Sequence, residues 1–228
     1  MDSSPLGRLS AELRNHIYEL VLTSPRPIAL VTVRNHSSTA LSAELERLRK
    51  RGGHTKRTGL TATCSTIRRE STRMFYAANS FELTIPIPQI ATGRQRLEAF
   101  LSTIGWSNAA ALRSIIVRIE DVKQEDTDRS FSPFADLPVL VNDLRELGAG
   151  YPNCAIVVKA DFMAGAHPEG AWRTVPLEID VRDPMGGWER GIEGMRGRRT
   201  EDFGWKWNLI EVGLEQCRDE QAKLVAQS

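Results

Sequence analysis

Long hydrophobic segments are missing from this sequence. Its uninterrupted apolar runs, such as 28–31 and 155–158, are only a few residues long, whereas a membrane-spanning helix needs about 20 apolar residues. The N-terminal residues 1–5 have no apolar core behind them, so we expect no secretory signal there. The sequence therefore predicts a protein without a membrane segment.

Cysteine and excess charge are both scarce. Cys64, Cys154 and Cys217 are odd in number and far apart in the sequence, which disfavours a disulfide framework and favours a reducing compartment. We therefore expect the protein in the cytoplasm or the nucleus. The 30 Lys and Arg residues nearly balance the 29 Asp and Glu residues, so a nucleic-acid binder with a broad basic face is not expected.

Recognisable catalytic and metal-binding motifs are absent as well. The four histidines have neither the spacing of H-E-x-x-H nor a C-x-x-C pair beside them. No G-x-S-x-G elbow provides a hydrolase nucleophile. The glycine-rich stretch 183–199 lacks the Lys and Ser or Thr of a phosphate-binding loop, and the acidic stretch 120–128 lacks the glycine and final glutamate of a calcium loop. We predict no catalytic residue, no cofactor and no metal.

What the sequence does contain is a series of amphipathic helices, beginning near the N-terminus. Ser10 is expected to cap a helix that runs to about Leu22. The apolar residues on one face of this helix are Leu9, Leu13, Ile17 and Leu20. They recur at the spacing of a face that packs against another element. An extended segment is expected at 28–33.

Two more helices are predicted before residue 80. One starts at Ser37 or Ser38, and its apolar positions are Leu41, Leu45 and Leu48. The other is the most strongly amphipathic helix of the sequence. Its buried face is predicted to comprise Leu60, Cys64, Ile67, Met74 or Phe75, and Ala78. Asn79 is expected to end this helix, because it tolerates the left-handed conformation.

The middle of the sequence alternates between strand and helix patterns. Strands are predicted at 81–85, 114–119 and 154–160, with helices at 97–104 and 136–147 between them. Such an alternation predicts parallel strands joined by crossover helices.

The last quarter is less regular. A further strand is expected at 177–181, and the glycine- and arginine-rich residues 183–199 predict a mobile loop. Asn208 is expected to cap a final helix. Its apolar stripe is Ile210, Leu214, Cys217 and Leu224. The tryptophans concentrated here, Trp172, Trp188, Trp205 and Trp207, belong either to the core or to a contact surface.

A basic segment lies between the second and third predicted helices. Its cations are Arg47, Arg49, Lys50, Arg51, Lys56 and Arg57. They form either an exposed linker at 47–58 or a patch that contacts phosphates. The second interpretation makes a nucleic-acid-associated protein the alternative function, although glycines within the run and the lack of aromatics favour the linker.

Two blocks of sequence resemble a known family. The first block, residues 9–22, reads LSAELRNHIYELVL. The second block consists of TCSTIRRES at 63–71 followed by MFYAANSF at 74–81. In this order they resemble the signatures of a large uncharacterised fungal family that begins with an F-box-like helix, LPxELRNxIYELxL. Ser10 stands at the family's proline, and residues 28–57 form an insertion between the blocks.

The resemblance implies a helical N-terminal module that precedes an α/β region. Together with the strand and helix patterns, it predicts an α+β fold in which a helical F-box-like module, residues 1–80, packs on a small mixed or parallel β-sheet with crossover helices in residues 81–228. It also implies a non-catalytic protein–protein interaction module, namely a substrate-recognition adaptor of a ubiquitin ligase. In F-box proteins the module docks on the small adaptor subunit of cullin-type ligases. The partner-binding residues would be Leu6, Leu9, Glu12, Leu13 and Ile17. Alternatively, Leu9, Leu13 and Ile17 pack against Ile67 and Phe75 within one core.

Overall fold

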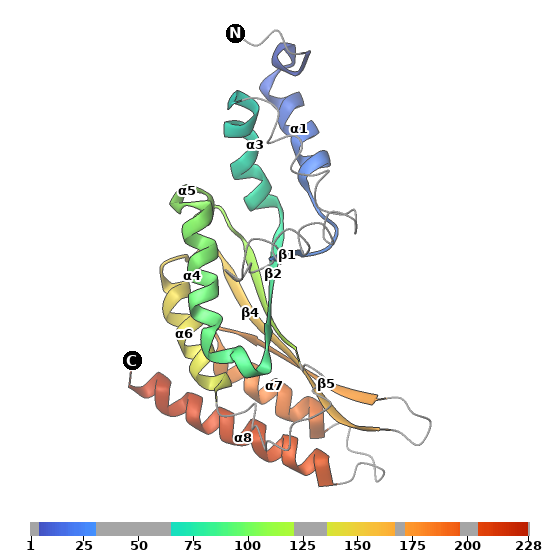
Figure 1. Cartoon of the computed structure of the whole chain (residues 1–228), viewed down its shortest axis with the longest axis vertical. Coiled ribbons are helices and arrows are strands. Elements are labelled where there is room, and N and C mark those ends of the chain that lie inside the picture. The colour runs from blue at the N-terminus through green and yellow to red at the C-terminus, as the bar shows by residue number, and fades with distance from the viewer. Residues whose placement is uncertain (1–4, 31–64, 121–135, 167–171, 197–204, 228) are drawn as a thin grey trace, which may run out of the picture.

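The computed structural model describes residues 5–30, 65–120, 136–166, 172–196 and 205–227 (Figure 1). Two short 3-10 helices are present at Pro5–Arg8 and Ile87–Thr92. The other helices are α1 (Ala11–Leu22), α3 (Ser65–Ala78), α4 (Gly93–Ile104), α5 (Trp106–Ala109), α6 (Leu137–Ala149), α7 (Pro184–Arg196) and α8 (Trp205–Ala226). The strands are β1 (Ile28–Leu30), β2 (Ser80–Pro86), β3 (Ser114–Glu120), β4 (Ala155–Ala166) and β5 (Trp172–Asp180).

The described strands form one mixed sheet, which confirms the predicted α+β fold. They lie in the order in which they occur along the chain, β1 to β5. The first four are parallel, and β5 returns antiparallel to β4. The alternation of strands and helices predicted the parallel pairing of β2, β3 and β4. The register places Phe81 beside Ile115 and Ile115 beside Ile156, so apolar side chains of neighbouring strands share one face.

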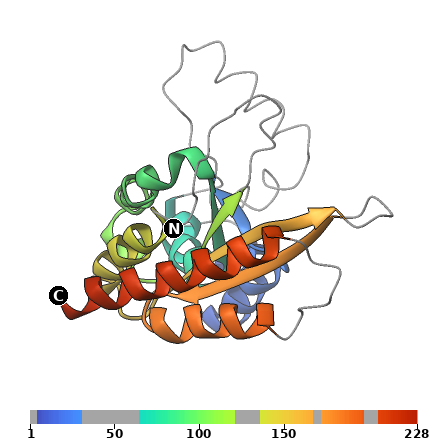
Figure 2. The same cartoon turned by 90° about the horizontal axis from the view of Figure 1, so that it is seen from below.

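The helices of this region cover that apolar face. A Cβ atom added at Gly93 of α4 would meet the side chain of Ile85, and one added at Gly148 of α6 would approach Ile156. The register places Ile85 and Ile156 on the same face of the sheet, so α4 and α6 cover the same face. Parallel strands added in chain order, with crossovers of one hand, place their connecting helices on the same face. Figure 2 shows α8 running beside α7 and past α6 in this layer.

The opposite face of the sheet carries paired charges. Arg118 donates to both carboxylate oxygens of Glu82, at 2.9 and 3.2 Å, and lies 3.5 Å from Asp161. Lys159 pairs with Glu178 at 2.6 Å. These side chains alternate with the buried ones along each strand, because successive residues of a strand point to opposite faces.

Residues 183–199 were predicted to be a mobile loop, and this prediction is wrong for 184–196, which form α7. Trp188, Ile192 and Met195 recur at helical spacing and are buried. Gly187 and Gly191 let the helix approach β5 closely, since a Cβ atom at Gly187 would lie 2.9 Å from the Cα atom of Ile179. Two of the glycines that suggested a loop, Gly187 and Gly191, are therefore contact positions of a helix.

An N-terminal arm, formed by α1 and α3, extends beyond one end of the sheet (Figure 1). Among the described residues the buried apolar side chains form two clusters. The larger one lies between the sheet and its helices, and the smaller one comprises Tyr18, Leu22 and Ile67. Phe75 packs against both. Ile67 is buried, as predicted.

The predicted end of α3 at Asn79 agrees with the structure, whereas the predicted C-terminus of α6 and the predicted N-terminus of α8 differ from it. Asn79 stops α3 with its side chain, whose amide donates to the Phe75 carbonyl at 2.7 Å, and no described non-glycine residue has a positive φ. The helix predicted to end at Gly148 continues to Ala149. The final helix begins at Trp205, so Asn208 lies inside it and does not cap it. The predicted helix at 38–51, Leu60 and Cys64 lie outside the described residues.

Candidate functional site

The first helix, α1, is well defined at both ends. The Ser10 hydroxyl accepts a hydrogen bond from the Leu13 amide at 3.4 Å, which is the predicted N-cap. Glu12 lies in the first turn, where a carboxylate interacts favourably with the helix dipole. At the other end the Thr23 amide donates to the Glu19 carbonyl at 3.1 Å. The helix therefore holds its side chains in fixed directions.

The inner face of α1 contacts α3. Tyr18 and Leu22 are fully buried and pack with Ile67 of α3. The Tyr18 hydroxyl donates to Glu70 at 3.1 Å, and the Arg14 guanidinium lies 3.4 Å from the same carboxylate. Residues 14, 18 and 22 share one side of the helix because they are four positions apart.

Asn79 joins the arm to the sheet. It is 3% exposed and sits between α3 and β2. Its side-chain oxygen accepts from the Ser24 amide at 2.6 Å, and its side-chain nitrogen donates to the Leu22 carbonyl at 3.0 Å. One side chain thus ends α3 and also holds the chain that leaves α1.

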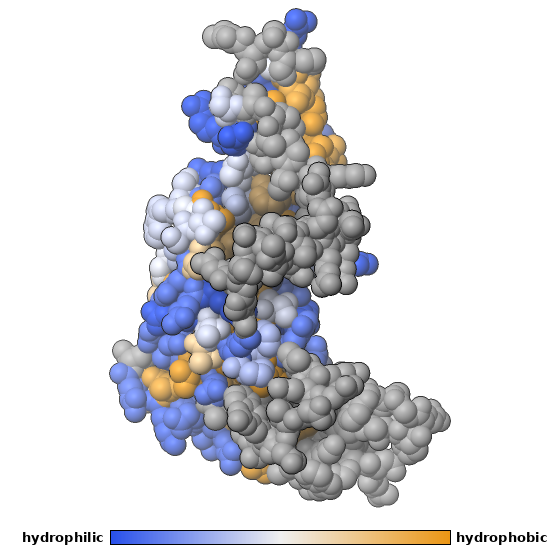
Figure 3. Space-filling model, viewed as in Figure 1, coloured by the Kyte–Doolittle hydropathy of each residue, from blue (hydrophilic) through white to orange (hydrophobic). Residues whose placement is uncertain are grey.

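The outer face of α1 carries apolar side chains that no described residue covers. Leu13, Leu20 and Val21 are 55%, 71% and 45% exposed, and Ile17 between them is partly exposed. Positions 13, 17, 20 and 21 follow the i, i+4, i+7, i+8 spacing of one helix face. We call these four residues the outer stripe. Figure 3 shows hydrophobic atoms along this side of the arm.

The predicted partner-binding residues divide between the two faces. Leu13 and Ile17 belong to the outer stripe, and Glu12 is exposed beside it. Leu9 is partly exposed, and its carbonyl accepts from Arg14 at 2.8 Å. Leu6 packs against the inner cluster and is therefore not part of the outer stripe.

The expected packing of Leu9, Leu13 and Ile17 against Ile67 and Phe75 is wrong, because Tyr18 and Leu22 occupy that position. Leu20 and Val21 were not among the predicted partner-binding residues. The signal for them was present in the sequence, since they extend the spacing of Leu13 and Ile17 by one helical turn.

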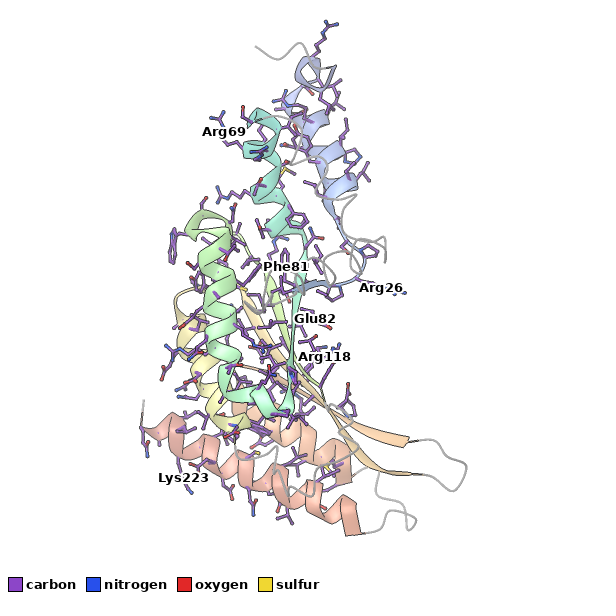
Figure 4. All side chains as sticks on the ribbon, in the orientation of Figure 1. Arg26, Arg69, Phe81, Glu82, Arg118 and Lys223 are labelled. Carbon is purple, nitrogen blue, oxygen red and sulfur yellow. The ribbon has the colours of Figure 1, made fainter. Side chains whose placement is uncertain are left out.

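Charged side chains differ between the two sides of the arm. Glu12, His16 and Glu19 are exposed on α1 next to the outer stripe. Arg69 and Arg73 are exposed on α3, and Figure 4 shows Arg69 on the side of α3 away from α1. Within the described part of the chain neither Glu12 nor Glu19 has an ion-pair partner.

A shallow pocket of about 400 Å³ lies where α6 ends and β4 begins. Its lining is mostly apolar, with Arg145 and Arg182 at its edge. Arg182 donates to the carbonyls of Pro152 and Cys154, at 2.7 Å each. Burial raises the pKa of the Cys154 thiol to about 11. The positive charge of nearby Arg182 acts in the opposite direction and is the smaller effect. The thiol is protonated near neutral pH and is a poor nucleophile.

The other cysteine in the described ranges is buried too. Cys217 lies on the apolar stripe of α8, as predicted, and burial raises its pKa to about 12. Among the described residues no three histidines, cysteines or carboxylates converge to hold a metal ion.

Of the tryptophans in the last quarter, Trp188 belongs to the core. The cations at 47–57 and most of the acidic stretch 120–128 fall outside the described ranges.

Comparison with protein-family models, with curated proteins and with solved structures found no match. The F-box-like resemblance of residues 9–22 and 63–81 therefore stays a prediction. None of the helices in the described ranges is long and apolar enough to cross a lipid bilayer.

Proposed function

We propose that this protein is a non-catalytic protein–protein interaction module that docks through the outer stripe of α1. The observation that supports the proposal is the exposure of Leu13, Leu20 and Val21 on one face of a well-capped helix. Single exposed apolar residues are common on protein surfaces, but a contiguous row on one helix is typical of a docking surface.

The size of the outer stripe favours a modest, reversible complex. Complete burial of an exposed Leu or Val side chain contributes about 1.5 to 3 kcal/mol. Leu13, Leu20 and Val21 are 55%, 71% and 45% exposed, so part of their surface is already buried. Burial of the rest would together contribute roughly 2 to 5 kcal/mol. Association costs about 4 to 15 kcal/mol in lost freedom. A stable complex therefore needs further contacts around the stripe.

The partner that we propose is the small adaptor subunit of a cullin-type ubiquitin ligase, which is the partner that the resemblance of residues 9–22 implies. The α/β region would then be free to select a substrate. A cytoplasmic or nuclear location follows from this partner, and the scattered cysteines favour the same location.

The proposal is tested by titrating the full chain with purified adaptor in a calorimeter. We expect Leu13→Asp and Val21→Asp each to weaken binding at least about tenfold, because a carboxylate would be desolvated in an apolar contact. Val212→Asp on α8 is the matched control, since Val212 is 48% exposed and Val21 is 45% exposed. Circular dichroism would check that all three variants remain folded.

Two results would contradict the proposal. If the adaptor binds and all three variants bind equally well, the outer stripe is not the docking surface. If the adaptor does not bind the unmodified chain at micromolar concentrations, the ligase assignment is wrong.

A further inference from the structure

The outer stripe has an acidic flank. Glu12, His16 and Glu19 are exposed on one side of it. Glu12 and Glu19 are seven residues apart, which places them about 10 Å apart along the helix axis. Within the described ranges no cation pairs with either carboxylate.

The other flank is already neutralised. Arg14 lies on that side, 3.4 Å from Glu70, and donates to the Leu9 carbonyl at 2.8 Å. Glu70 also accepts from Tyr18. Among the described residues, the outer stripe is therefore bordered by unpaired carboxylates on one side and by an ion pair on the other.

From this asymmetry, and resting on the proposed function of the outer stripe, we infer the chemistry of the partner element. It is an amphipathic helix whose apolar face is flanked on one side by two Lys or Arg residues about two turns apart. Its apolar side chains cover Leu13 and Leu20, and its cations lie opposite Glu12 and Glu19. Complementary charges of this kind set the orientation of the partner and speed association.

The same charges disfavour a second copy of this chain as the occupant. In an antiparallel pair of arms related by a two-fold axis, Glu12 of one copy would lie near Glu19 of the other. Like charges brought together in this way destabilise the pair. The partner must therefore carry the opposite sign.

Two synthetic helical peptides would test the inference. Both carry leucines at i, i+4 and i+7, and they differ only at two flanking positions seven residues apart, which are Lys in one and Glu in the other. Binding to the full chain is followed by fluorescence anisotropy. Two exposed ion pairs predict roughly 3- to 10-fold tighter binding of the Lys peptide at low salt. The preference should shrink at high salt because these charges are screened.

Charge reversal on the protein provides the second arm of the test. The double variant Glu12→Lys/Glu19→Lys should reverse the preference for the Lys peptide. The matched control is Glu189→Lys/Glu193→Lys on α7, which changes the net charge equally at two exposed positions away from the arm. We expect the control to keep the preference.

The outcomes separate this inference from the proposed function. Equal affinity for both peptides, lost in Leu13→Asp, would overturn the charge inference and leave the docking surface intact. No binding of either peptide would count against the docking surface itself. A doubled mass of the chain in light scattering, abolished by Leu13→Asp, would make a second copy the occupant and overturn the inference.

Discussion

The N-terminal arm and the α/β region use apolar residues in different ways. In the α/β region, apolar side chains from the strands and from α4, α6, α7 and α8 face one another in a large buried cluster. In the arm, the described buried cluster consists of Tyr18, Leu22 and Ile67, and the apolar residues of the outer stripe face away from it. Within the described parts of the two regions, only the arm presents a row of exposed apolar side chains along one helix.

Charges follow the same division. In the α/β region Arg94 of α4 pairs with Glu98 and with Glu146 of α6, at 3.0 and 3.1 Å. Hydrogen bonding to Glu82 raises the pKa of Arg118. Arg94 and Arg118 of this region thus pair with carboxylates of neighbouring elements. Among the described residues, Glu12 and Glu19 beside the outer stripe have no cation as a partner. The comparison indicates that the sheet supports the fold and that the arm is suited to contact a partner.

The largest expected effects distinguish the two clusters by their stability. Leu144→Ala in the large cluster should lower the free energy of unfolding by roughly 3 to 5 kcal/mol, because the dense surroundings of Leu144 cannot collapse around the cavity. Ile67→Ala should cost roughly 2 to 3 kcal/mol, since the small cluster can relax more easily. Urea unfolding measures both values.

Hydrogen exchange would show whether the arm unfolds separately from the sheet. In Ile67→Ala the amides of α1 and α3 should lose protection while β3 and β4 keep theirs, as expected when one region opens by itself. If protection falls equally in both regions, the arm and the sheet unfold as one unit and the comparison fails.

A smaller effect is expected at the joint between the regions. Asn79→Ala should cost roughly 1 to 3 kcal/mol, because it leaves the Ser24 amide and the Leu22 carbonyl without their partner. Asn142→Ala is the control. Asn142 contacts Glu146 and Arg145 of its own helix, α6, so its replacement should cost less than about 0.5 kcal/mol. Equal melting temperatures of the two variants would show that Asn79 does not hold the arm.

The smallest effect concerns a polar residue inside the α/β region. Gln221 of α8 is fully buried, and among the described residues neither its side-chain oxygen nor its nitrogen has a hydrogen-bond partner. Gln221→Leu should therefore stabilise the protein by about 1 kcal/mol. Gln216→Leu, at an exposed position of the same helix, should leave the melting temperature almost unchanged. A destabilised Gln221→Leu variant would show that the amide is paired in solution.

Much of the candidate site could be predicted from sequence. The cap at Ser10, the span of α1 and the apolar spacing of Leu13, Ile17 and Leu20 all follow from local pattern. The local pattern did not show which side of this helix is buried. Tyr18 and Leu22 form a second apolar face, and packing against Ile67 selected it.

Helix α7 shows the converse problem. Its glycines and arginines have the composition of a loop, yet Trp188, Ile192 and Met195 have the spacing of a helix. A glycine in a helix normally costs about 1 kcal/mol relative to alanine. Here Gly187 and Gly191 permit a close approach to β5, and this contact offsets the cost.

The sequence by itself determined the types of most elements, the parallel pairing of β2, β3 and β4, and the capped first helix, because these depend on short-range periodicity. Only the tertiary structure decided which face of α1 is buried, that 184–196 form a helix, and that the buried residues divide into two clusters. These outcomes depend on which surfaces meet, and residues far apart in the chain, such as Tyr18 and Ile67, supply those surfaces.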